Sequence, residues 1–323
     1  MGRPASSKWH REDCVRRSRP CPVCGTPSDS AAIFLESNVD ETRINSFSFA
    51  SRKTPEFMNH KLVRCPICDL VYVSEPPEQA ELATGYREAD YDSSEEAEDA
   101  AVAYISAMRR ALESLPTRTD ALEIGTGTGA LLDHLHIIGF RNLVGFEPST
   151  AAIASAPPHR QEWIRPITFE EHEFDDHSFD LVCCFMTLEH VLDPKELADG
   201  VLRLLRPGGA FVTVTHDCDS RVNTTLGRRS PIIDIEHMQL FSRTSIVELL
   251  ARSGYQRISV AGFKNRYALR YWWRLLPLPE PVRRAGAALL RVSRVDRLKI
   301  TLNVGNTMAI GYAPTVAPSN DTK

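Results

Sequence analysis

The sequence lacks any continuous apolar stretch of about 18 residues, so we expect no transmembrane helix. Arginines occur near its beginning, but no apolar segment follows them, and this excludes the pattern of a secretory signal. A strong excess of one charge is also missing, because 38 basic residues oppose 42 acidic ones and leave a net charge of −4. General attraction to nucleic acid is therefore not expected. With 42% hydrophobic and 25% charged residues, the composition is ordinary for a soluble globular protein.

Two common phosphate-binding patterns are missing from the chain's glycine-rich stretch. An apolar run at 121–124 leads into glycines at positions 125, 127 and 129, and helical periodicity starts at 130. This pattern predicts a buried strand, a tight turn and a helix start whose N–H groups face a ligand. The turn contains no Gly-Lys-Ser/Thr, and its third glycine comes one residue too early for the dinucleotide fingerprint. A nicotinamide-dependent oxidoreductase is therefore disfavoured.

Two carboxylates frame this turn. Glu123 precedes it, and Glu147 ends the next predicted strand, at 143–147. An acidic residue about 20 positions after such a turn is placed to hold the hydroxyls of a ribose. Glu123 would repel a pyrophosphate and tolerate a cation. The predicted ligand is therefore an adenosine that carries positive charge and no phosphate, and S-adenosylmethionine has these properties.

With these residues the stretch resembles motif I of the class I S-adenosylmethionine-dependent methyltransferases. Segments 178–184, 187–191 and 204–210 are similar to later family motifs: the fourth strand, the loop beneath the methionine moiety and the turn before the fifth strand. The resemblance covers about residues 100–262 and a last strand near 302–311, and it implies an α/β fold with a Rossmann-like sheet. Thr168 stands where relatives often have Asp. The implied cofactor contacts are Glu123, Gly125, Gly127, Gly129, Glu147, Thr168, Phe169, Thr187, Leu188 and Glu189.

Two Cys-x-x-Cys pairs lie in the N-terminal part, at Cys21 and Cys24 and at Cys65 and Cys68. Four sulfur ligands suit tetrahedral zinc, and four thiolates leave no open position for water, so the predicted site is structural. Buried or disulfide-bonded cysteines are the alternative. The segment also resembles the small zinc-binding module that precedes some bacterial methyltransferase domains.

These patterns divide the chain into five predicted parts. They are a disordered basic tail (1–19), a zinc-binding module (20–77), an acidic linker and helix (78–118), a methyltransferase domain (119–312) and a disordered tail (313–323). A contact of the basic tail with an acidic partner remains open. A solvated linker is the simplest interpretation of the acidic residues, while the resemblance implies that Tyr86 and Tyr91 form a lid over the cofactor.

Histidine is the natural general base near neutral pH. His190, His216 and His237 all lie near the predicted ligand-binding edge of the sheet. Because His190 belongs to a widely shared motif, we expect it to shape the cofactor loop. His237 follows Glu236 in a loop that relatives use to cover the substrate, so His237 is the first candidate base and His216 the second. A structural role is the alternative for each.

Within the methyltransferase domain, residues 264–299 form a predicted basic amphipathic insertion. It carries ten Lys and Arg residues against two acidic ones, together with Trp272 and Trp273, and its prolines divide it into two short helical pieces. Basic amphipathic helices with Trp suit an anionic membrane surface. Packing on the sheet and a dimer contact are the alternatives.

These observations favour an S-adenosylmethionine-dependent methyltransferase that acts on a small-molecule or on a sugar- or lipid-linked acceptor. We expect a cytoplasmic protein, peripheral at the inner membrane face if the insertion binds lipid. An RNA methyltransferase and a non-catalytic S-adenosylmethionine-binding regulator remain as alternatives, although no nucleic-acid partner is expected. The acceptor atom (oxygen, nitrogen or carbon) and the oligomeric state do not follow from the sequence, because one scaffold supports all of them.

Overall fold

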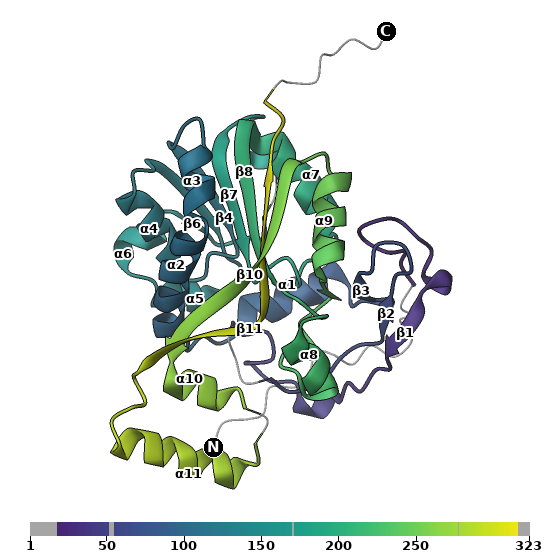
Figure 1. Ribbon diagram of the computed structural model, residues 1–323, viewed down its shortest axis with the longest axis vertical. Coiled ribbons are helices and arrows are strands. Elements are labelled where there is room, and N and C mark those ends of the chain that lie inside the picture. Colours follow the sequence, from purple (N-terminus) through teal and green to yellow (C-terminus); the bar gives the residue numbers. More distant parts are fainter. Residues whose placement is uncertain (1–17, 52–54, 170, 277, 316–323) are drawn as a thin grey trace.

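The computed structural model describes residues 18–51, 55–169, 171–276 and 278–315, and Figure 1 shows their arrangement. The predicted basic tail lies outside the described residues except for Ser18 and Arg19, and the predicted C-terminal tail lies outside them beyond residue 315. Within the described ranges, the chain forms one sheet of seven strands and one of four, with helices packed around them.

The seven-stranded sheet has the order β10-β11-β8-β7-β4-β5-β6. Neighbours from β6 to β8 are parallel, whereas β11 is antiparallel to both β8 and β10. β7 is buried along its whole length, as expected for a strand with helices on both faces. This arrangement confirms the predicted α/β fold with a Rossmann-like sheet. The strands are β4 (Asp120–Ile124), β5 (Asn142–Phe146), β6 (Ile164–Arg165), β7 (Phe179–Phe185), β8 (Leu205–His216), β10 (Gln256–Ala268) and β11 (Lys299–Tyr312).

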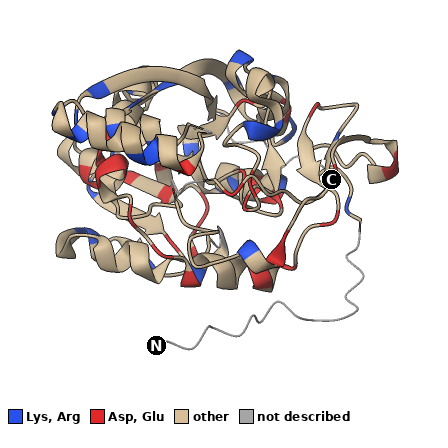
Figure 2. Cartoon of the chain, turned by 90° about the horizontal axis from the view of Figure 1, so that it is seen from below, with Lys and Arg blue, Asp and Glu red and all other residues tan. Residues whose placement is uncertain are grey.

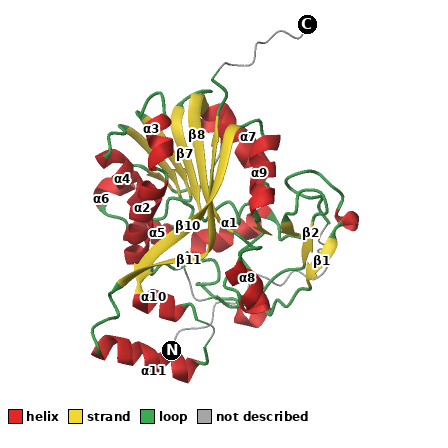
Figure 3. Ribbon diagram, viewed as in Figure 1, coloured by secondary structure: helices red, strands yellow, loops and turns green. Residues whose placement is uncertain are grey.

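Helices cover both faces of this sheet, as Figure 3 shows. Successive strand residues point to opposite faces, so Ala121 joins one hydrophobic cluster and Leu122 the other. The helices are α2 (Ser94–Ala107), α3 (Arg109–Ser114), α4 (Ala130–Ile137), α5 (Thr150–Ser155), α6 (Pro158–Gln161), α7 (Pro194–Leu204) and α9 (Arg243–Arg252). The side chains of Ser149, Asp193 and Ser242 cap the starts of α5, α7 and α9, and each accepts a hydrogen bond from the backbone N–H three residues on.

The last two strands are longer than predicted and carry a helical arm. Phe263 and Tyr267 are buried while Lys264 and Arg266 are exposed, so this stretch alternates as a strand and belongs to β10. The predicted insertion therefore begins at Leu269 rather than at 264. It consists of α10 (Leu269–Arg274) and α11 (Glu280–Val292), with Pro277 outside the described residues. Figure 1 shows α11 at the far end of the β10–β11 hairpin, away from the sheet.

The N-terminal segment forms a small antiparallel sheet together with one strand from the methyltransferase region. Its order is β1-β2-β3-β9, where β9 is Gln239–Leu240. The Arg19 guanidinium donates to the carbonyl oxygens of Val73, Leu192 and Met238, and so ties this sheet to the larger one. The segment is thus packed into the rest of the chain. Its other elements are η1 (Ser28–Ser30), β1 (Ala32–Leu35), η2 (Glu41–Arg43), β2 (Leu62–Arg64) and β3 (Val71–Val73).

The acidic stretch after this sheet is folded, in contrast to a solvated linker. It forms α1 (Gln79–Glu88) and then α2, which buries Tyr104 against the larger sheet. Its carboxylates face the basic arm. The ion pairs between the two are Glu95–Arg270, Asp92–Arg274 and Asp99–Lys299.

The remaining elements are short: η3 (Glu171–Glu173) lies before β7, and α8 (Arg221–Leu226) and η4 (Gly227–Arg229) follow β8. Basic and acidic residues are interspersed over many elements, as Figure 2 shows, in keeping with the nearly balanced charge. Among the described residues, no helix combines the length and the hydrophobicity needed to cross a membrane.

Candidate active site

A cavity of about 1030 Å³ lies at the carboxyl ends of the parallel strands. Ligands of open α/β sheets bind at this edge. The wall of the cavity is built from the glycine turn after β4, the ends of β5, β7 and β8, helix α1 and the β10–β11 hairpin with α10. It includes these predicted site residues: Glu123, Gly125, Gly127, Glu147, Thr168, Phe169, Thr187, His216 and His237.

The glycine turn needs glycine for two different reasons. At Gly125, where φ is +77°, a Cβ would lie 2.1 Å from the Thr187 hydroxyl oxygen, so the close approach of two loops excludes a side chain. At Gly127, φ is +57° and no heavy atom lies within 4 Å of the position of a Cβ. Since Gly127 lines the cavity, its backbone is open to a ligand there.

Glu147 is fixed at the end of β5 by two backbone donors. Its Oε2 accepts a hydrogen bond from Gly127 N–H at 2.8 Å, and its Oε1 accepts one from Ser149 N–H, also at 2.8 Å. Burial raises the pKa of this carboxyl above its ordinary value, while the two N–H groups act in the opposite direction. A carboxylate has room for further donors, so Glu147 suits the two hydroxyls of a ribose.

Glu123 and the residues after β6 complete this end of the cavity. Glu123 is the second-last residue of β4, is only 5% exposed and accepts a hydrogen bond from the Thr126 hydroxyl at 2.5 Å. Phe169 packs edge-on against Phe146, with ring centroids 5.4 Å apart. Phe169 and Thr168 thus border the cavity on the β6 side.

Three of the predicted cofactor residues do not line the cavity. Gly129 starts α4 and faces the Arg160 side chain, and Leu188 is fully buried in the hydrophobic core. Glu189 is also fully buried, and its Oε1 accepts a hydrogen bond from the backbone N–H of His216 at 2.7 Å. Burial raises the pKa of Glu189 to about 7. These residues thus lie behind the residues that line the cavity. Their position in a motif does not show in which direction their side chains point.

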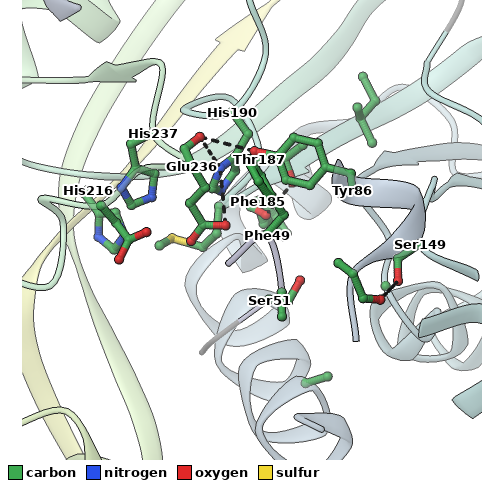
Figure 4. Close-up of a pocket in the computed structure, with 18 of the residues that line it drawn as sticks. Phe49, Ser51, Tyr86, Ser149, Phe185, Thr187, His190, His216, Glu236 and His237 are labelled. Atoms are coloured by element: carbon green, nitrogen blue, oxygen red, sulfur yellow. Dashed lines mark hydrogen bonds and ion pairs between the residues drawn. The ribbon is translucent and has the colours of Figure 1, made fainter. Parts of the chain in front are cut away.

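Three histidines gather beside Glu236 at the other side of the cavity, as Figure 4 shows. The ring centroids of His190 and His237 are 4.9 Å apart, and those of His216 and His237 are 5.4 Å apart. They come from the loop after β7, the end of β8 and the loop before β9. The predicted convergence of these loops is thus present in the structure.

The hydrogen bonds of these histidines define where each ring carries its hydrogen. Nδ1 of His237 lies 2.8 Å from the carbonyl oxygen of Ile232, and a carbonyl only accepts, so Nδ1 donates. Nδ1 of His190 contacts the Glu236 carbonyl oxygen at 3.2 Å in the same way. In the neutral rings, Nε2 therefore holds a lone pair that can accept a proton.

His216 differs from the other two histidines in its hydrogen-bond partner. Its Nδ1 is 2.8 Å from the side-chain oxygen of Asn306 on β11. Burial lowers the pKa of His216 to about 4, so the ring is neutral at physiological pH. A base of such low pKa takes up protons poorly near pH 7, which favours His237 of the two predicted candidates.

Several residues of the wall belong to no motif that the sequence displays. Phe49 and Ser51, from the loop between η2 and β2, line the cavity although no motif surrounds them. Asn306 interrupts the apolar pattern of the last strand, and such a buried polar residue is a signal that could have been noticed. Tyr86 was expected at the lid. It lies on α1, and its hydroxyl donates to the Glu236 carbonyl oxygen at 3.2 Å.

The four N-terminal cysteines come together at the base of the small sheet, outside this cavity. Their sulfur atoms all lie within 4.8 Å of one another, and the Cys21–Cys68 and Cys24–Cys65 sulfurs are each 3.4 Å apart. These separations are far longer than a disulfide bond of about 2.05 Å. They are close to the ~3.8 Å edge of a tetrahedron with zinc–sulfur bonds of about 2.3 Å. The donor set therefore fits a tetrahedral metal ion.

A family model described as a methyltransferase domain matches residues 97–260, about half of the chain. The chain belongs to this methyltransferase domain family. The match begins in α2 and ends in β10, so it contains the glycine turn, Glu147 and all three clustered histidines. The cysteine cluster and the α10–α11 arm lie outside it.

Individual relatives of this methyltransferase domain protein match shorter stretches. One from Mycolicibacterium smegmatis, named "Probable S-adenosylmethionine-dependent methyltransferase", is 28% identical over 138 residues, which are 42% of this chain and 52% of that protein. A ubiquinone biosynthesis O-methyltransferase of Alkalilimnicola ehrlichii is 34% identical over 114 residues, or 33% of this chain and 46% of its own. The chain thus spans about half the length of the curated relatives it matches. The crystal structure of a SAM dependent methyltransferase from Archaeoglobus fulgidus, 16% identical, aligns with a TM-score of 0.44 over 66% of this chain and 94% of its own.

Proposed function

We propose that this chain is an S-adenosylmethionine-dependent methyltransferase with a small-molecule acceptor. One observation supports this most directly: Gly127 presents bare backbone to the cavity beside Glu147, whose carboxylate is fixed by the N–H groups of Gly127 and Ser149. The pair offers space for a ligand and an acceptor for ribose hydroxyls, and the family match surrounds it. The curated relatives named for ubiquinone biosynthesis support a small-molecule acceptor.

When bound, S-adenosylmethionine supplies the activated methyl group, so the task of the protein is to hold and orient the reactants. In this proposal Glu147 accepts hydrogen bonds from the ribose, and Glu123 offers negative charge near the cationic end. Thr168 and Phe169 border the adenine. Gly125 and Thr187 close the turn beneath the methionine part.

His237 is proposed as the general base. Its Nδ1 is held by the Ile232 carbonyl, so Nε2 takes the proton that the acceptor loses as it attacks the methyl carbon. The cofactor would supply the leaving group, a neutral thioether that takes the electrons of the broken carbon–sulfur bond. Glu236 lies next to the pair of rings, with an Oε2 atom 3.9 Å from Nδ1 of His190, and its negative charge would stabilise a protonated histidine.

Calorimetric titration with S-adenosylhomocysteine and with NAD tests the cofactor assignment. We expect S-adenosylhomocysteine to bind and NAD not to bind. Weaker binding is expected for Glu147→Gln, which keeps the shape of the side chain and removes its charge. Absence of S-adenosylhomocysteine binding would overturn the proposal, and binding without methylation of any acceptor would favour the regulatory alternative.

We also propose that Cys21, Cys24, Cys65 and Cys68 hold one structural zinc ion. The support is the spacing of the four sulfurs and the burial of three of the four side chains. A site with four protein ligands has no position for water or substrate, so its role would be to hold the small sheet together.

Peripheral contact with an anionic membrane is proposed for the C-terminal part of the arm, residues 289–298. In α11 no residue is buried, and Leu289 and Val292 are 68% and 82% exposed. Apolar side chains alternate there with Arg291, Arg294 and Arg297, for which the described part of the chain provides no ion-pair partner. Exposed apolar residues flanked by arginines suit a lipid surface with negative head groups.

The two parts of the arm differ in this respect. In α10, Tyr271 and Trp272 are buried in the core, so this helix covers the sheet. Arg283 and Arg284 both pair with Glu280, which reduces the charge that they offer to a partner. The proposed contact is therefore limited to the end of α11 and the turn that follows it.

A further inference from the structure

The cavity extends well beyond the cofactor and histidine residues. Its volume of about 1030 Å³ is at the upper end of the range for small-molecule sites, about 300–1,000 Å³. Past His216 the wall continues along the hairpin and α10, through Val304, Leu302, Trp273 and Leu276. Leu276 and Leu302 are 44% and 40% exposed, so this end of the cavity reaches the protein surface near the arm.

The wall of this extension is mainly apolar, and three of its polar groups are bound elsewhere. The indole N–H of Trp272 donates to the Ile300 carbonyl oxygen at 3.0 Å, and that of Trp273 donates to the Arg283 carbonyl oxygen at 2.9 Å. The side-chain oxygen of Asn306 is engaged by His216. Asn265 also lines this part of the cavity, opposite Leu302, but most of the surface that a ligand would meet there consists of ring carbons and aliphatic side chains.

The same arm that carries the exposed apolar residues also holds this wall in place. A Cβ on Gly286 of α11 would lie 2.0 Å from a ring carbon of Trp273, so the helix backbone packs directly on the indole. Together with the hydrogen bond to Arg283, this contact fixes the ring of Trp273 between α11 and the cavity. The surface proposed to meet the membrane and the apolar end of the cavity are thus parts of one structural unit.

We propose that this extension receives the hydrocarbon chain of an amphiphilic acceptor, whose head group lies at the histidines. The inference rests on the proposed methyltransferase function and names its substrate class. Burial of each CH₂ group of such a chain contributes favourably to binding, and a chain longer than the cavity would emerge beside Leu289 and Val292, where lipid would cover it. A fully water-soluble acceptor would leave the apolar wall exposed to water.

Quenching of tryptophan fluorescence by a brominated long-chain alcohol tests this directly, because bromine quenches indoles only at short range. The chain has four tryptophans, so Trp9→Phe and Trp163→Phe leave Trp272 and Trp273 as reporters. The probe is used below its micelle concentration and without vesicles. We expect saturable quenching that the unbrominated alcohol reverses.

Two leucine variants provide the matched comparison in this background. Leu302→Gln changes the wall and should raise the dissociation constant of the alcohol roughly three- to tenfold. Leu298 is exposed nearby but does not line the cavity, so Leu298→Gln should leave binding unchanged. No quenching, or equal loss in the two variants, would overturn the inference. Titration of the same protein with S-adenosylhomocysteine separates the two proposals. If S-adenosylhomocysteine binds and the alcohol does not, only the hydrocarbon-chain site is rejected. If the alcohol binds and S-adenosylhomocysteine does not, the proposed function is rejected.

Discussion

Gly127 and Gly139 flank α4 and share a left-handed backbone, with φ of +57° and +113°. Neither has an atom within 4 Å of a would-be Cβ, yet only Gly127 lines the cavity. Gly127→Val should therefore raise the Kd of S-adenosylhomocysteine at least tenfold, because the side chain occupies the ligand's space. Gly139→Val should carry a similar backbone strain, about 1–2 kcal/mol, and keep normal affinity. Calorimetry and urea unfolding of both variants make the comparison, and equal affinity in the two would contradict it.

His237→Ala tests the proposed base. We expect turnover to fall by about 10²–10⁴-fold, the usual contribution of a positioned base, while the affinity for S-adenosylhomocysteine stays the same. His136→Ala is the control, because His136 is exposed on α4 and does not line the cavity. Turnover and cofactor affinity are measured on the same preparations. Unchanged turnover in His237→Ala would exclude this role.

Glu189 predicts a pH dependence of stability. Its pKa is about 7 in the folded protein and close to 4.5 when unfolded, so ionisation is disfavoured by folding. The contribution of Glu189 is complete below pH 4.5 and is lost as the pH rises to 7, by about 2–3 kcal/mol at most. Glu189→Gln should remove this component. Urea unfolding of both proteins between pH 4.5 and 8 measures it, and parallel stability curves would show that Glu189 does not titrate there.

Among the elements, the small sheet depends on the cysteine cluster at its base. Purified protein should contain about one zinc ion per chain, and Cys65→Ser should lose it. Because metal binding and folding are linked, the variant should also be less stable. β3 pairs with β9, and Val73 N–H donates to the carbonyl oxygen of Met238, the residue after His237, at 2.9 Å. Because loss of the small sheet would release the loop that carries His237, turnover should fall as well.

Cys218→Ser is the control for this experiment. Cys218 is buried like Cys65 but lies outside the cluster of four sulfurs. Its replacement should reduce stability without changing the zinc content. Metal analysis by mass spectrometry distinguishes the two variants, and an equally stable, metal-free protein would refute the zinc proposal.

At the arm, the end of α11 predicts salt-sensitive binding to anionic vesicles. Each basic residue near such a surface contributes on the order of 1 kcal/mol, so changing Arg291, Arg294 and Arg297 to Glu should abolish co-sedimentation. Neutral vesicles should not bind the protein. The control is an equal charge change at Arg109 and Arg110 of α3 and at Arg118 in the loop that follows, which should have little effect. Figure 1 shows α3 at the opposite end of the molecule from α11. If the protein stays in the supernatant at low salt and elutes as a dimer, the arm is a subunit contact instead.

Across the whole molecule, the sequence predicts those structural features that depend on residues close together in the chain. The strands around Glu123 and Glu147 follow from local periodicity and spacing. Lys264 and Arg266 were predicted in the basic insertion because of their charge. They alternate with the buried Phe263 and Tyr267, and this alternation places them in β10. The charge of a segment indicates which kind of partner its exposed surface could bind. The alternation of apolar and charged residues indicates whether the segment is instead a strand of the sheet.

Contacts between distant segments could not be predicted in this way. The ion pairs of α2 with the arm join residues about 175 positions apart, as in Glu95–Arg270. Side-chain direction within a motif is equally hidden, which is why Leu188 and Glu189 were expected at the cofactor and lie in the core. Both features depend on how elements pack, and no local pattern encodes that packing.

The strand order of the small sheet has a consequence for synthesis of the chain. β3 pairs with β9, so residues 71–73 leave the ribosome long before residues 239–240 exist. At about 5–20 residues per second, the interval is on the order of ten to thirty seconds. During that time β3 is an exposed edge with unpaired backbone groups, the kind of template that recruits other strands. A fragment that ends at residue 77 would keep this edge permanently, so it should aggregate where the full chain does not.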